Sequence, residues 1–379
     1  MTVRIIQDDC LDALPRLAAD GLRVHAVVTD PPYHLTSIVK RFGQEGSAPA
    51  KSAKTGVYAR SAAGFMGQKW DGGDVAFRPE TWAAVAACMR PGAHLAAFGG
   101  TRTYHRMAVA IEDAGLEIRD TLAWVFASGF PKSHNQDGDW EGWGSALKPA
   151  FEPIILARKP LAGTIAANLA AHGCGALNID GCRIESGGTH GSASRAGQGA
   201  GHETANADGL IYGKGLGGVV APPHPAGRWP ANLLHDGSAE VLDVFAAFGE
   251  STSIGGYRGA GARENGYGMK ADVEKRPVGF GDTGTAARFF MCAKADAADR
   301  AGSKHPTVKP GALMRWLVKL ITPPGGTVLD PFAGTGSTGL AADQLGMDAV
   351  LIEQSAEYAA DARRKITANA GLFARVAAE

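Results

Sequence analysis

The chain has 379 residues, enough for a large hydrophobic core and for one α/β domain with a sizeable insertion or a second small domain. Its 38 basic and 38 acidic side chains balance, which excludes a global basic field, so any nucleic-acid contact has to come from local patches. No apolar run is long enough to span a bilayer and no charged-then-apolar leader is seen, so we expect a soluble, cytoplasmic protein without membrane contact.

The 5 cysteines are odd in number and form no Cys-x-x-Cys pair. This argues against a disulfide framework and a zinc ribbon, and favours a reducing compartment. Cys174 and Cys182 with His172 match no common ligand spacing, so we expect them to be structural and expect no metal site.

The first part of the chain, up to about Leu161, alternates short apolar runs with segments of helical spacing. The helical spacing predicts helices, the second of which has Pro79 at a suitable first position. This alternation predicts a mostly parallel sheet with helices on both faces. The expected strands are residues 3–7, 24–29, 94–99, 120–126 and 152–158, and the expected helices are 10–19, 79–90 and 103–115.

The middle of the chain is glycine-rich, with 26 of the 52 glycines between Gly173 and Gly284. Such a segment buries little apolar area per residue, so we expect loops with short elements at 229–236 and 287–294. Boundaries are expected near Leu161 and Ser303. The α/β pattern then returns with helices at 310–321, 338–346 and 355–369 and strands at 327–332 and 348–354.

A glycine motif lies between the strand and the helix expected on either side of it. Gly334, Gly336 and Gly339 have the G-x-G-x-x-G spacing that lets backbone approach a nucleotide-like ligand, and Glu353 ends the next strand near the ~20-residue spacing of a ribose-binding acid. A tight glycine turn with a surface glutamate is the alternative. The fingerprint alone also allows an NAD-dependent oxidoreductase, but the Asp-Pro-Phe that begins at Asp330 restricts the approach and favours S-adenosylmethionine.

The stretch Asp30-Pro31-Pro32-Tyr33 follows the second expected strand. The exocyclic amino group of a base is a poor nucleophile, and acceptors for both of its hydrogens would aim its lone pair at a sulfonium methyl. Asp30 would supply a carboxylate and Pro31 a carbonyl that the two prolines hold in a fixed direction. Tyr33 would offer its ring to a base taken out of the stack. A strand-ending turn is the alternative.

Together these motifs resemble the β-group of amino-directed DNA methyltransferases, where a D/N/S-P-P-Y/F motif, a target-recognition region and a DPFxGxG motif follow in this order. The resemblance implies a Rossmann-like seven-stranded, mostly parallel sheet of the S-adenosylmethionine-dependent methyltransferase type. Residues 1–161 and 304–379 would form its two parts and 162–303 an inserted recognition region. The segments 305–310 (HPTVKP) and 8–10 (DDC) also resemble family motifs, at the methionine and adenine ends of the cofactor. The implied cofactor-binding residues are Asp9, Cys10, Asp30, Thr307, Lys309, Asp330, Phe332, Gly334, Gly336, Ser337, Thr338 and Glu353.

The implied activity is transfer of a methyl group to N6 of adenine in double-stranded DNA, with base flipping. Asp at the first motif position is typical of adenine N6 enzymes, while Ser is commoner in cytosine N4 enzymes, so cytosine N4 stays open. No cysteine follows a proline, which argues against methylation at carbon 5 of cytosine. A methyltransferase that acts on RNA or on a protein side-chain amide is a further alternative, because it would keep both motifs and change only the methyl acceptor. Two possible partners also stay open: a separate restriction endonuclease of a restriction–modification pair, and a second copy of this chain in a homodimer.

Residues 34–69 carry six basic side chains and one acidic side chain, and predict a mobile loop that closes on DNA phosphates. A solvated linker is the alternative. Trp229 is expected to pack in a small core rather than to stack on a displaced base. The loop residues expected to bind DNA are Lys40, Arg41, Lys51, Lys54 and Arg60. Unranked candidates for reading bases are Arg183, Arg195, Arg228, Arg258, Arg263 and Arg288.

Overall fold

The computed structural model describes residues 1–33, 74–129, 133, 135–185, 224, 226–252, 256–258, 276–278, 282–293, 309–369 and 375–378. Side chains of 256–258, 276–278 and 375–378 are not described. The described chain divides into two compact units, one of Met1–Asn178, Asn232–Ser238 and Cys292–Glu379, the other of Ile179–Ala231 and Ala239–Met291. Some predicted contact residues lie outside the described residues, namely Lys40, Arg41, Lys51, Lys54, Arg60, Arg195, Arg263 and Thr307.

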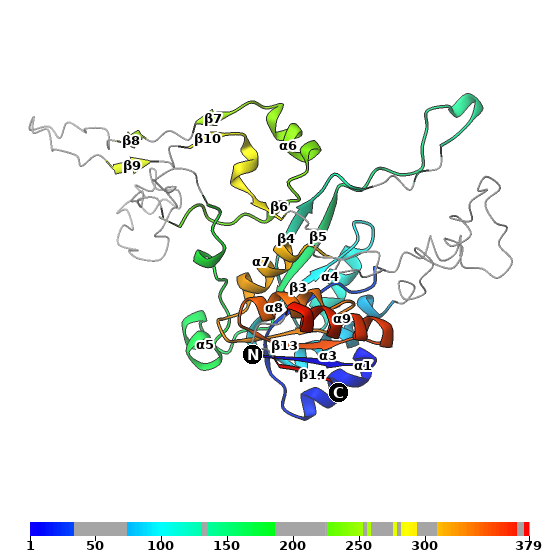
Figure 1. Ribbon diagram of the computed structural model, residues 1–379, viewed down its shortest axis with the longest axis vertical. Helices are drawn as coiled ribbons and strands as arrows, with labels where there is room; N and C mark the ends of the chain where they lie inside the picture. Colours follow the sequence, from blue (N-terminus) through cyan, green and yellow to red (C-terminus); the bar gives the residue numbers. More distant parts are fainter. Residues whose placement is uncertain are drawn as a thin grey trace, which may run out of the picture. The chain divides into compact units, whose positions relative to one another are not determined.

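The first unit is built on a twisted sheet (Figure 1). Its strands lie in the order β11-β6-β4-β5-β3-β2-β12-β13-β1-β14, so the described residues contribute ten strands. The strands are β1 Thr2–Ile6, β2 Val24–Thr29, β3 Met89–Phe98, β4 Glu117–Val125, β5 Phe151–Arg158, β6 Leu233–His235, β11 Met291–Cys292, β12 Thr327–Asp330, β13 Asp348–Ile352 and β14 Arg375–Ala378.

The sheet is mostly parallel, as predicted, but it has more strands than the seven expected. The ladders among β1, β2, β3, β12 and β13 are parallel, and β5 runs antiparallel to both β3 and β4. Strands β12 and β13 lie between β2 and β1, so the two α/β portions of the chain form one sheet. The additional strands are β6, β11 and β14, with two to four residues each. Strands β6 and β11 lie within the segments 229–236 and 287–294, where short elements were expected without a type, whereas β14 was not expected.

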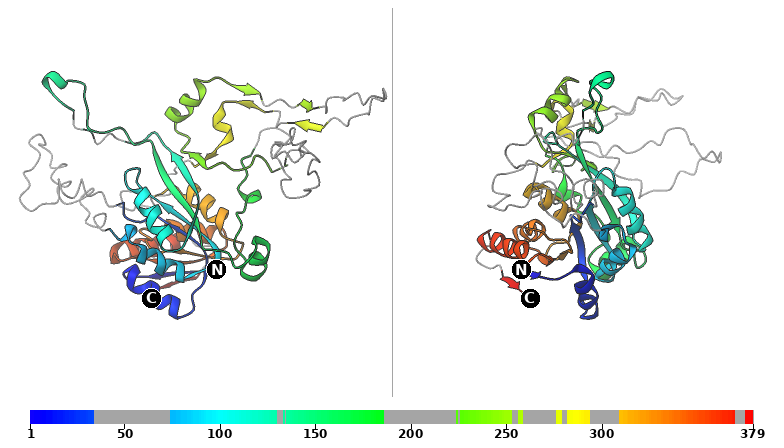
Figure 2. Two further views of the ribbon diagram at one scale, coloured as in Figure 1. Left: turned by 180° about the vertical axis from the view of Figure 1, so that it is seen from behind. Right: turned by 90° about the vertical axis from the view of Figure 1, so that its right-hand side faces the viewer.

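Helices cover both faces of the sheet, as Figure 2 shows in its right-hand view. Helices α1 (Cys10–Ala19), α3 (Pro79–Ala87) and α4 (Tyr104–Asp113) pack on one another over one face. Helices α7 (Gly311–Ile321), α8 (Ser337–Gln344) and α9 (Ala356–Asn369) cover the other, and α5 (Ile165–His172) packs against β3. Helix α3 ends before the predicted Arg90, because the residue before a proline disfavours helical angles and Pro91 follows.

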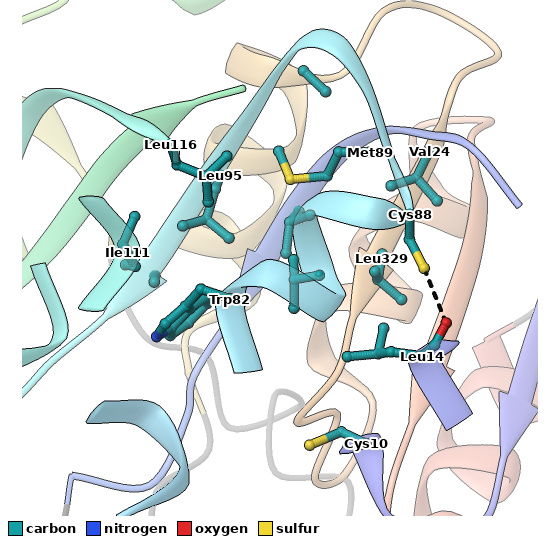
Figure 3. Close-up of a cluster of buried hydrophobic side chains, with 14 of the residues drawn as sticks. Cys10, Leu14, Val24, Trp82, Cys88, Met89, Leu95, Ile111, Leu116 and Leu329 are labelled. Carbon is teal, nitrogen blue, oxygen red and sulfur yellow. Dashed lines mark hydrogen bonds between the residues drawn. The ribbon is translucent and has the colours of Figure 1, made fainter. Parts of the chain in front are cut away.

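The hydrophobic core under the first face joins these helices to the sheet (Figure 3). Trp82 of α3 is fully buried and donates its indole N–H to the carbonyl of Ala76 at 2.9 Å. The thiol of Cys88 donates to the carbonyl of Leu14 of α1 at 3.5 Å. Burial of each large apolar side chain contributes about 1.5–3 kcal/mol. This core therefore holds the strands, and the loops at their ends, in a fixed position.

The second unit contains short elements: η5 (Asp180–Cys182), α6 (Ala239–Ala246), β7 (Ser251–Thr252), β8 (Gly256–Arg258), β9 (Arg276–Val278), β10 (Thr283–Gly284) and η6 (Ala286–Phe289). Antiparallel pairs form between β7 and β10 and between β8 and β9. Turns η3 (Val75–Phe77) and η4 (Gly138–Trp140) belong to the first unit. Among the described residues, no helix combines the length and apolarity needed to cross a membrane.

Candidate active site

Acidic residues stand at the carboxyl ends of four neighbouring parallel strands. Asp9 and Asp30 follow β1 and β2, Asp330 ends β12, and Glu353 follows β13. Because the order β2-β12-β13-β1 is joined by parallel ladders, these strand ends meet at one edge of the sheet. Open α/β sheets bind their ligands at this carboxyl edge. The edge is therefore the candidate site.

At the end of β2, four side chains form one hydrogen-bonded group, which we call the Lys309 cluster: Asp30, Tyr33, Glu152 and Lys309. The Lys309 ammonium nitrogen lies 3.0 Å from Oδ2 of Asp30 and 2.8 Å from Oε2 of Glu152. It also donates to the Tyr33 hydroxyl at 3.1 Å. The Tyr33 hydroxyl in turn donates to Oδ1 of Asp30 at 2.7 Å. Both oxygens of the Asp30 carboxylate are thus held.

The electrostatics of the Lys309 cluster follow from its burial. The Lys309 side chain is 7% exposed, against 24% for Asp30 and 23% for Glu152. Burial alone lowers the pKa of Lys309, but the Asp30 and Glu152 carboxylates and their hydrogen bonds outweigh it, and the pKa lies above its usual value. The ammonium also lies 4.7 Å from the centre of the Phe98 ring. Lys309 is therefore a fixed positive charge between two carboxylates.

The backbone of the Asp30-Pro31-Pro32-Tyr33 stretch is anchored as well. Pro31 is buried and Pro32 half-buried. The hydroxyl of Thr103 donates to the Tyr33 carbonyl at 3.0 Å. The stretch is thus held at its start by the buried Pro31 and at its end by Thr103.

Asp330, at the end of the adjacent β12, has a different environment. It is 3% exposed and accepts hydrogen bonds from the hydroxyls of Thr29 at 2.7 Å and Thr338 at 2.6 Å, and from the N–H of Phe332 at 3.0 Å. Burial raises the pKa of Asp330 to about 6 against the opposing effect of these hydrogen bonds. Asp330 and Thr338 therefore tie β12 to β2 and α8, and their side chains are occupied inside the protein.

The glycine loop after Asp330 is shaped by packing. Gly334 and Gly336 have φ angles of 51° and 76°, the left-handed region that favours glycine. A Cβ on Gly336 would lie 2.8 Å from the Cβ of Ala362 in α9, and one on Gly339 would lie 2.5 Å from a methyl carbon of Leu351 in β13. These two glycines permit close packing of α8 on its neighbours, and the approach of the glycine loop to a ligand stays a prediction.

Glu353 holds this loop from the end of β13. Its Oε2 accepts from the N–H of Gly334 at 2.7 Å and its Oε1 from the N–H of Ser355 at 2.8 Å. Burial raises the pKa of Glu353, while the two amide bonds oppose the rise. A carboxylate can accept about four hydrogen bonds, so Glu353 keeps acceptor capacity beyond these two.

The other predicted cofactor residues lie at the same edge. Asp9 caps α1, accepting from the N–H of Leu11 at 2.8 Å, and also accepts from Gln354 at 3.1 Å. The Cys10 thiol is buried in the core, which together with Asp9 raises its pKa to about 12, so it is inert. Ser337 accepts from Lys365 at 3.3 Å. Phe332 packs against the core.

Sequence reasoning missed Glu152 and Thr29. Glu152 is the one acidic residue of the otherwise largely apolar β5, Phe151–Arg158, and this was the available signal. Thr29 precedes Asp30, and only the pairing of β2 with β12 brings its hydroxyl to Asp330. Among the described residues, no three His, Cys, Asp or Glu side chains gather in a way that would hold a metal ion.

In the second unit, the described arginine side chains are engaged within the protein. Arg228, 6% exposed, makes two bonds of 2.5 and 2.6 Å to Asp282, which also pairs with Arg288 at 3.2 Å. Arg183 pairs with Asp180 at 2.8 Å and lies 5.5 Å from the Trp229 ring centre. Trp229 is 55% exposed, so the expectation of core packing was wrong; its ring lies beside the Arg183 guanidinium instead.

A family model for N6/N4 DNA methylases matches residues 24–364, which is most of the chain. The type II methyltransferase M.HindIII of Haemophilus influenzae is 28% identical over 188 residues, covering 42% of this chain and 60% of that relative. The type II methyltransferase M2.DpnII of Streptococcus pneumoniae is 37% identical over 70 residues, covering 18% and 26%. The chain thus spans less than two thirds of the length of either relative.

Solved structures also resemble the chain. The M1.HpyAVI–SAM complex has a TM-score of 0.44 at 16% identity and covers 97% of this chain and 99% of that one. The cytosine-N4-specific PvuII DNA methyltransferase has a TM-score of 0.41 at 12% identity and covers 96% and 87%.

Proposed function

The chain belongs to the N6/N4 DNA methylase family, and on that premise we propose that it transfers a methyl group from S-adenosylmethionine to an exocyclic amino group of DNA, namely N6 of adenine. The observation that supports this most is the Asp30 carboxylate, held at the ligand-binding edge of the sheet by Lys309 and Tyr33. The proposal excludes hydride transfer between a nicotinamide cofactor and a substrate, because that reaction would leave the Lys309 cluster without a role.

The residues at this edge fit the cofactor. S-adenosylmethionine, when bound, supplies an electrophilic methyl group on a sulfonium. Glu353 would accept from its ribose hydroxyls, since its carboxylate is fixed by two amides and keeps acceptor capacity. Because the Asp330 and Thr338 side chains are occupied, contact from this loop would come from backbone between Phe332 and Ser337. Asp9 and the backbone of Cys10 would lie at the adenine end, and Thr307, predicted nearby, is outside the described residues.

Asp30 acts on the amino group. Its carboxylate accepts a hydrogen bond from one amino hydrogen and the Pro31 carbonyl accepts from the other, which turns the nitrogen lone pair toward the methyl group. The amino nitrogen, on taking up the methyl group that the sulfonium supplies, would become positively charged. Asp30 stabilises that charge and accepts the proton that the nitrogen then loses. Tyr33, tied to Asp30 through its hydroxyl, offers its ring to the flipped base.

DNA binding is proposed for the basic segment 34–69, whose residues lie outside the described structure. Replacing Lys40, Arg41, Lys51 and Lys54 together by alanine should flatten the slope of log affinity against log salt by roughly 0.9 for each DNA phosphate that the variant no longer neutralises. A matched control removes four exposed arginines elsewhere, and an equal change in both proteins would contradict the proposal. These control residues, 64%, 51%, 49% and 61% exposed, are Arg16, Arg78, Arg119 and Arg364.

The experiment that tests the function uses S-adenosylmethionine labelled in its methyl group and unmethylated duplex DNA. After digestion to nucleosides, mass spectrometry identifies the labelled product. We expect N6-methyladenine. N4-methylcytosine would keep the mechanism but change the base, and no labelled nucleoside across DNA of diverse sequence would contradict the proposal. A separate restriction endonuclease and a homodimer stay predictions.

A further inference from the structure

All three donors of the Lys309 ammonium are used inside the protein. An ammonium group has three N–H bonds. In the Lys309 cluster they face Oδ2 of Asp30 at 3.0 Å, Oε2 of Glu152 at 2.8 Å and the Tyr33 hydroxyl at 3.1 Å. No donor is left over for the carboxylate at the methionine end of a bound cofactor, the end at which the sequence resemblance placed Lys309.

The position of Glu152 follows from the one antiparallel strand among the central strands. Because β5 runs opposite to β3, its first residues lie beside the carboxyl end of β3, and Phe98 pairs with Ile154. A residue at the start of β5 is thereby brought to the edge where the parallel strands β2 and β12 end. Glu152 is two residues before Ile154, and its carboxylate reaches Lys309 at that edge.

We infer that Glu152 is a positioning residue for methyl transfer: it anchors Lys309 so that the ammonium orients Asp30 and Tyr33 and does not bind the cofactor carboxylate. This rests on the proposed function of the site. With Glu152 present, one ammonium is shared between two carboxylates, and the cluster carries a net charge of about −1. The Asp30 carboxylate therefore keeps acceptor capacity for the amino group.

Loss of the Glu152 charge would change both the geometry and the charge of the cluster. Because the Lys309 side chain is largely buried, water cannot replace the lost carboxylate as its partner. Its ammonium would then pair with Asp30 alone, the remaining carboxylate of the cluster. The one-to-one pair would be neutral, and Asp30 would be a poorer acceptor for the amino hydrogen and a poorer partner for the developing positive charge. Cofactor affinity would not change, because no cluster donor binds the cofactor in this arrangement.

The opposite end of β5 offers a matched control. Arg158 pairs with Glu117 of β4 at 2.7 Å, and the two side chains are 10% and 40% exposed. Glu117→Gln therefore removes a carboxylate from a largely buried cation on the same strand, but away from the site. It should leave turnover as in the wild type.

The test compares Glu152→Gln, Glu152→Asp and Glu117→Gln with the wild type. For Glu152→Gln we expect a 10- to 100-fold loss of kcat on DNA, with KM for S-adenosylmethionine and affinity for S-adenosylhomocysteine within about threefold of the wild type. Glu152→Asp, which keeps the charge, should recover part of the loss. Unchanged kcat in Glu152→Gln, or a loss of cofactor affinity equal to the loss of kcat, would overturn the inference.

A second measurement separates this inference from the proposed function. Thermal unfolding of Glu152→Gln, Lys309→Met and the double variant forms a cycle, and we expect the double variant to lose clearly less in Tm than the two single losses together. Lys309→Met should also bind S-adenosylhomocysteine like the wild type. If the wild type transfers no methyl group to DNA, the proposed function fails while these results still decide where Lys309 is engaged. Additive Tm losses, or lost binding by a folded Lys309→Met, would overturn the inference.

Discussion

Two Asp-Pro dipeptides end neighbouring strands of the same sheet, yet their aspartates have opposite surroundings. Asp30, after β2, faces a lysine ammonium and a tyrosine hydroxyl and is 24% exposed. Asp330, at the end of β12, is 3% exposed and is bonded to two threonine hydroxyls and a backbone amide. The motifs look alike in the sequence, and only the neighbouring residues show that one aspartate lies beside a buried ammonium while the other joins two strands and a helix.

The difference follows from what each neighbouring element contributes. The loop before α7 brings Lys309 to Asp30, whereas β2 and α8 bring only neutral hydroxyls, Thr29 and Thr338, to Asp330. A buried carboxylate among neutral donors is disfavoured in its charged form, which is why the pKa of Asp330 rises to about 6. A partly exposed carboxylate beside an ammonium remains an acceptor. Substitution of Asp30 should therefore lower the rate of methyl transfer, whereas substitution of Asp330 should change the stability of the fold.

The largest expected effect is that of Asp30→Ala. This substitution removes an acceptor for the amino hydrogen and for the proton that leaves, and should reduce the rate of methyl transfer by about 10²- to 10⁴-fold. The fold should survive, because Lys309 keeps Glu152 and Tyr33 as partners. Single-turnover transfer to DNA, with far-ultraviolet circular dichroism as the check on folding, measures this. Near-normal transfer by a folded variant would refute the role given to Asp30.

Asp330→Asn should instead change how stability depends on pH. Since folding raises the pKa of Asp330 from 3.8 to about 6, its contribution to stability is fully present below about pH 4 and is lost as the pH rises through about 6. The asparagine variant has no such loss, so the stability of the wild type relative to the variant should fall by on the order of 3 kcal/mol between pH 4 and 7.

Urea unfolding of the two proteins at several pH values measures this difference. The Thr338 hydroxyl can donate to the Val28 carbonyl at 3.3 Å when the amide replaces Oδ2, so the variant should still fold. A stability difference that does not change with pH would show that Asp330 does not titrate in this way.

Tyr33→Phe should have the smallest effect. It keeps the ring and removes the hydrogen bond to Asp30 and the acceptor for Lys309. A hydrogen bond of this kind is worth about 1 kcal/mol, so we expect a loss of kcat of about tenfold or less and an unchanged KM for S-adenosylmethionine. Tyr33→Ala, which also removes the ring, is the companion variant. If both variants lose the same amount, the ring has no role of its own in holding the base.

Much of the sheet could be predicted because its strands are apolar and regular. The range 24–29 matches β2 and the range 10–19 matches α1. Short elements were expected where β6 and β11 lie, but their pairing into the sheet could not be predicted, and β14 was missed, because two to four residues carry no periodicity and depend on their pairing partners. The start of β3 at Met89 was also missed, since Pro91 and Gly92 within it suggest a turn.

The site was partly predictable for a similar reason. Motif residues next to each other in the chain, such as Asp30 and Tyr33, could be found together. Glu152 and Thr29 could not be assigned to the site from the sequence. The antiparallel direction of β5 and the pairing of β2 with β12 bring them there from distant positions in the chain. The contacts of Asp330 with Thr29 and Thr338 were equally out of reach of the sequence, and its predicted contact with the cofactor stays a prediction.

The division of roles between the two aspartates is tested most directly by single-turnover methyl transfer of Asp30→Asn and Asp330→Asn, measured side by side with saturating cofactor and DNA. Asparagine keeps the size of each side chain, removes its charge and replaces one acceptor oxygen by an amide donor. We predict that Asp30→Asn loses at least about 10²-fold in rate while Asp330→Asn stays within about threefold of the wild type. Rapid transfer by Asp30→Asn together with loss of transfer by a folded Asp330→Asn would contradict the account.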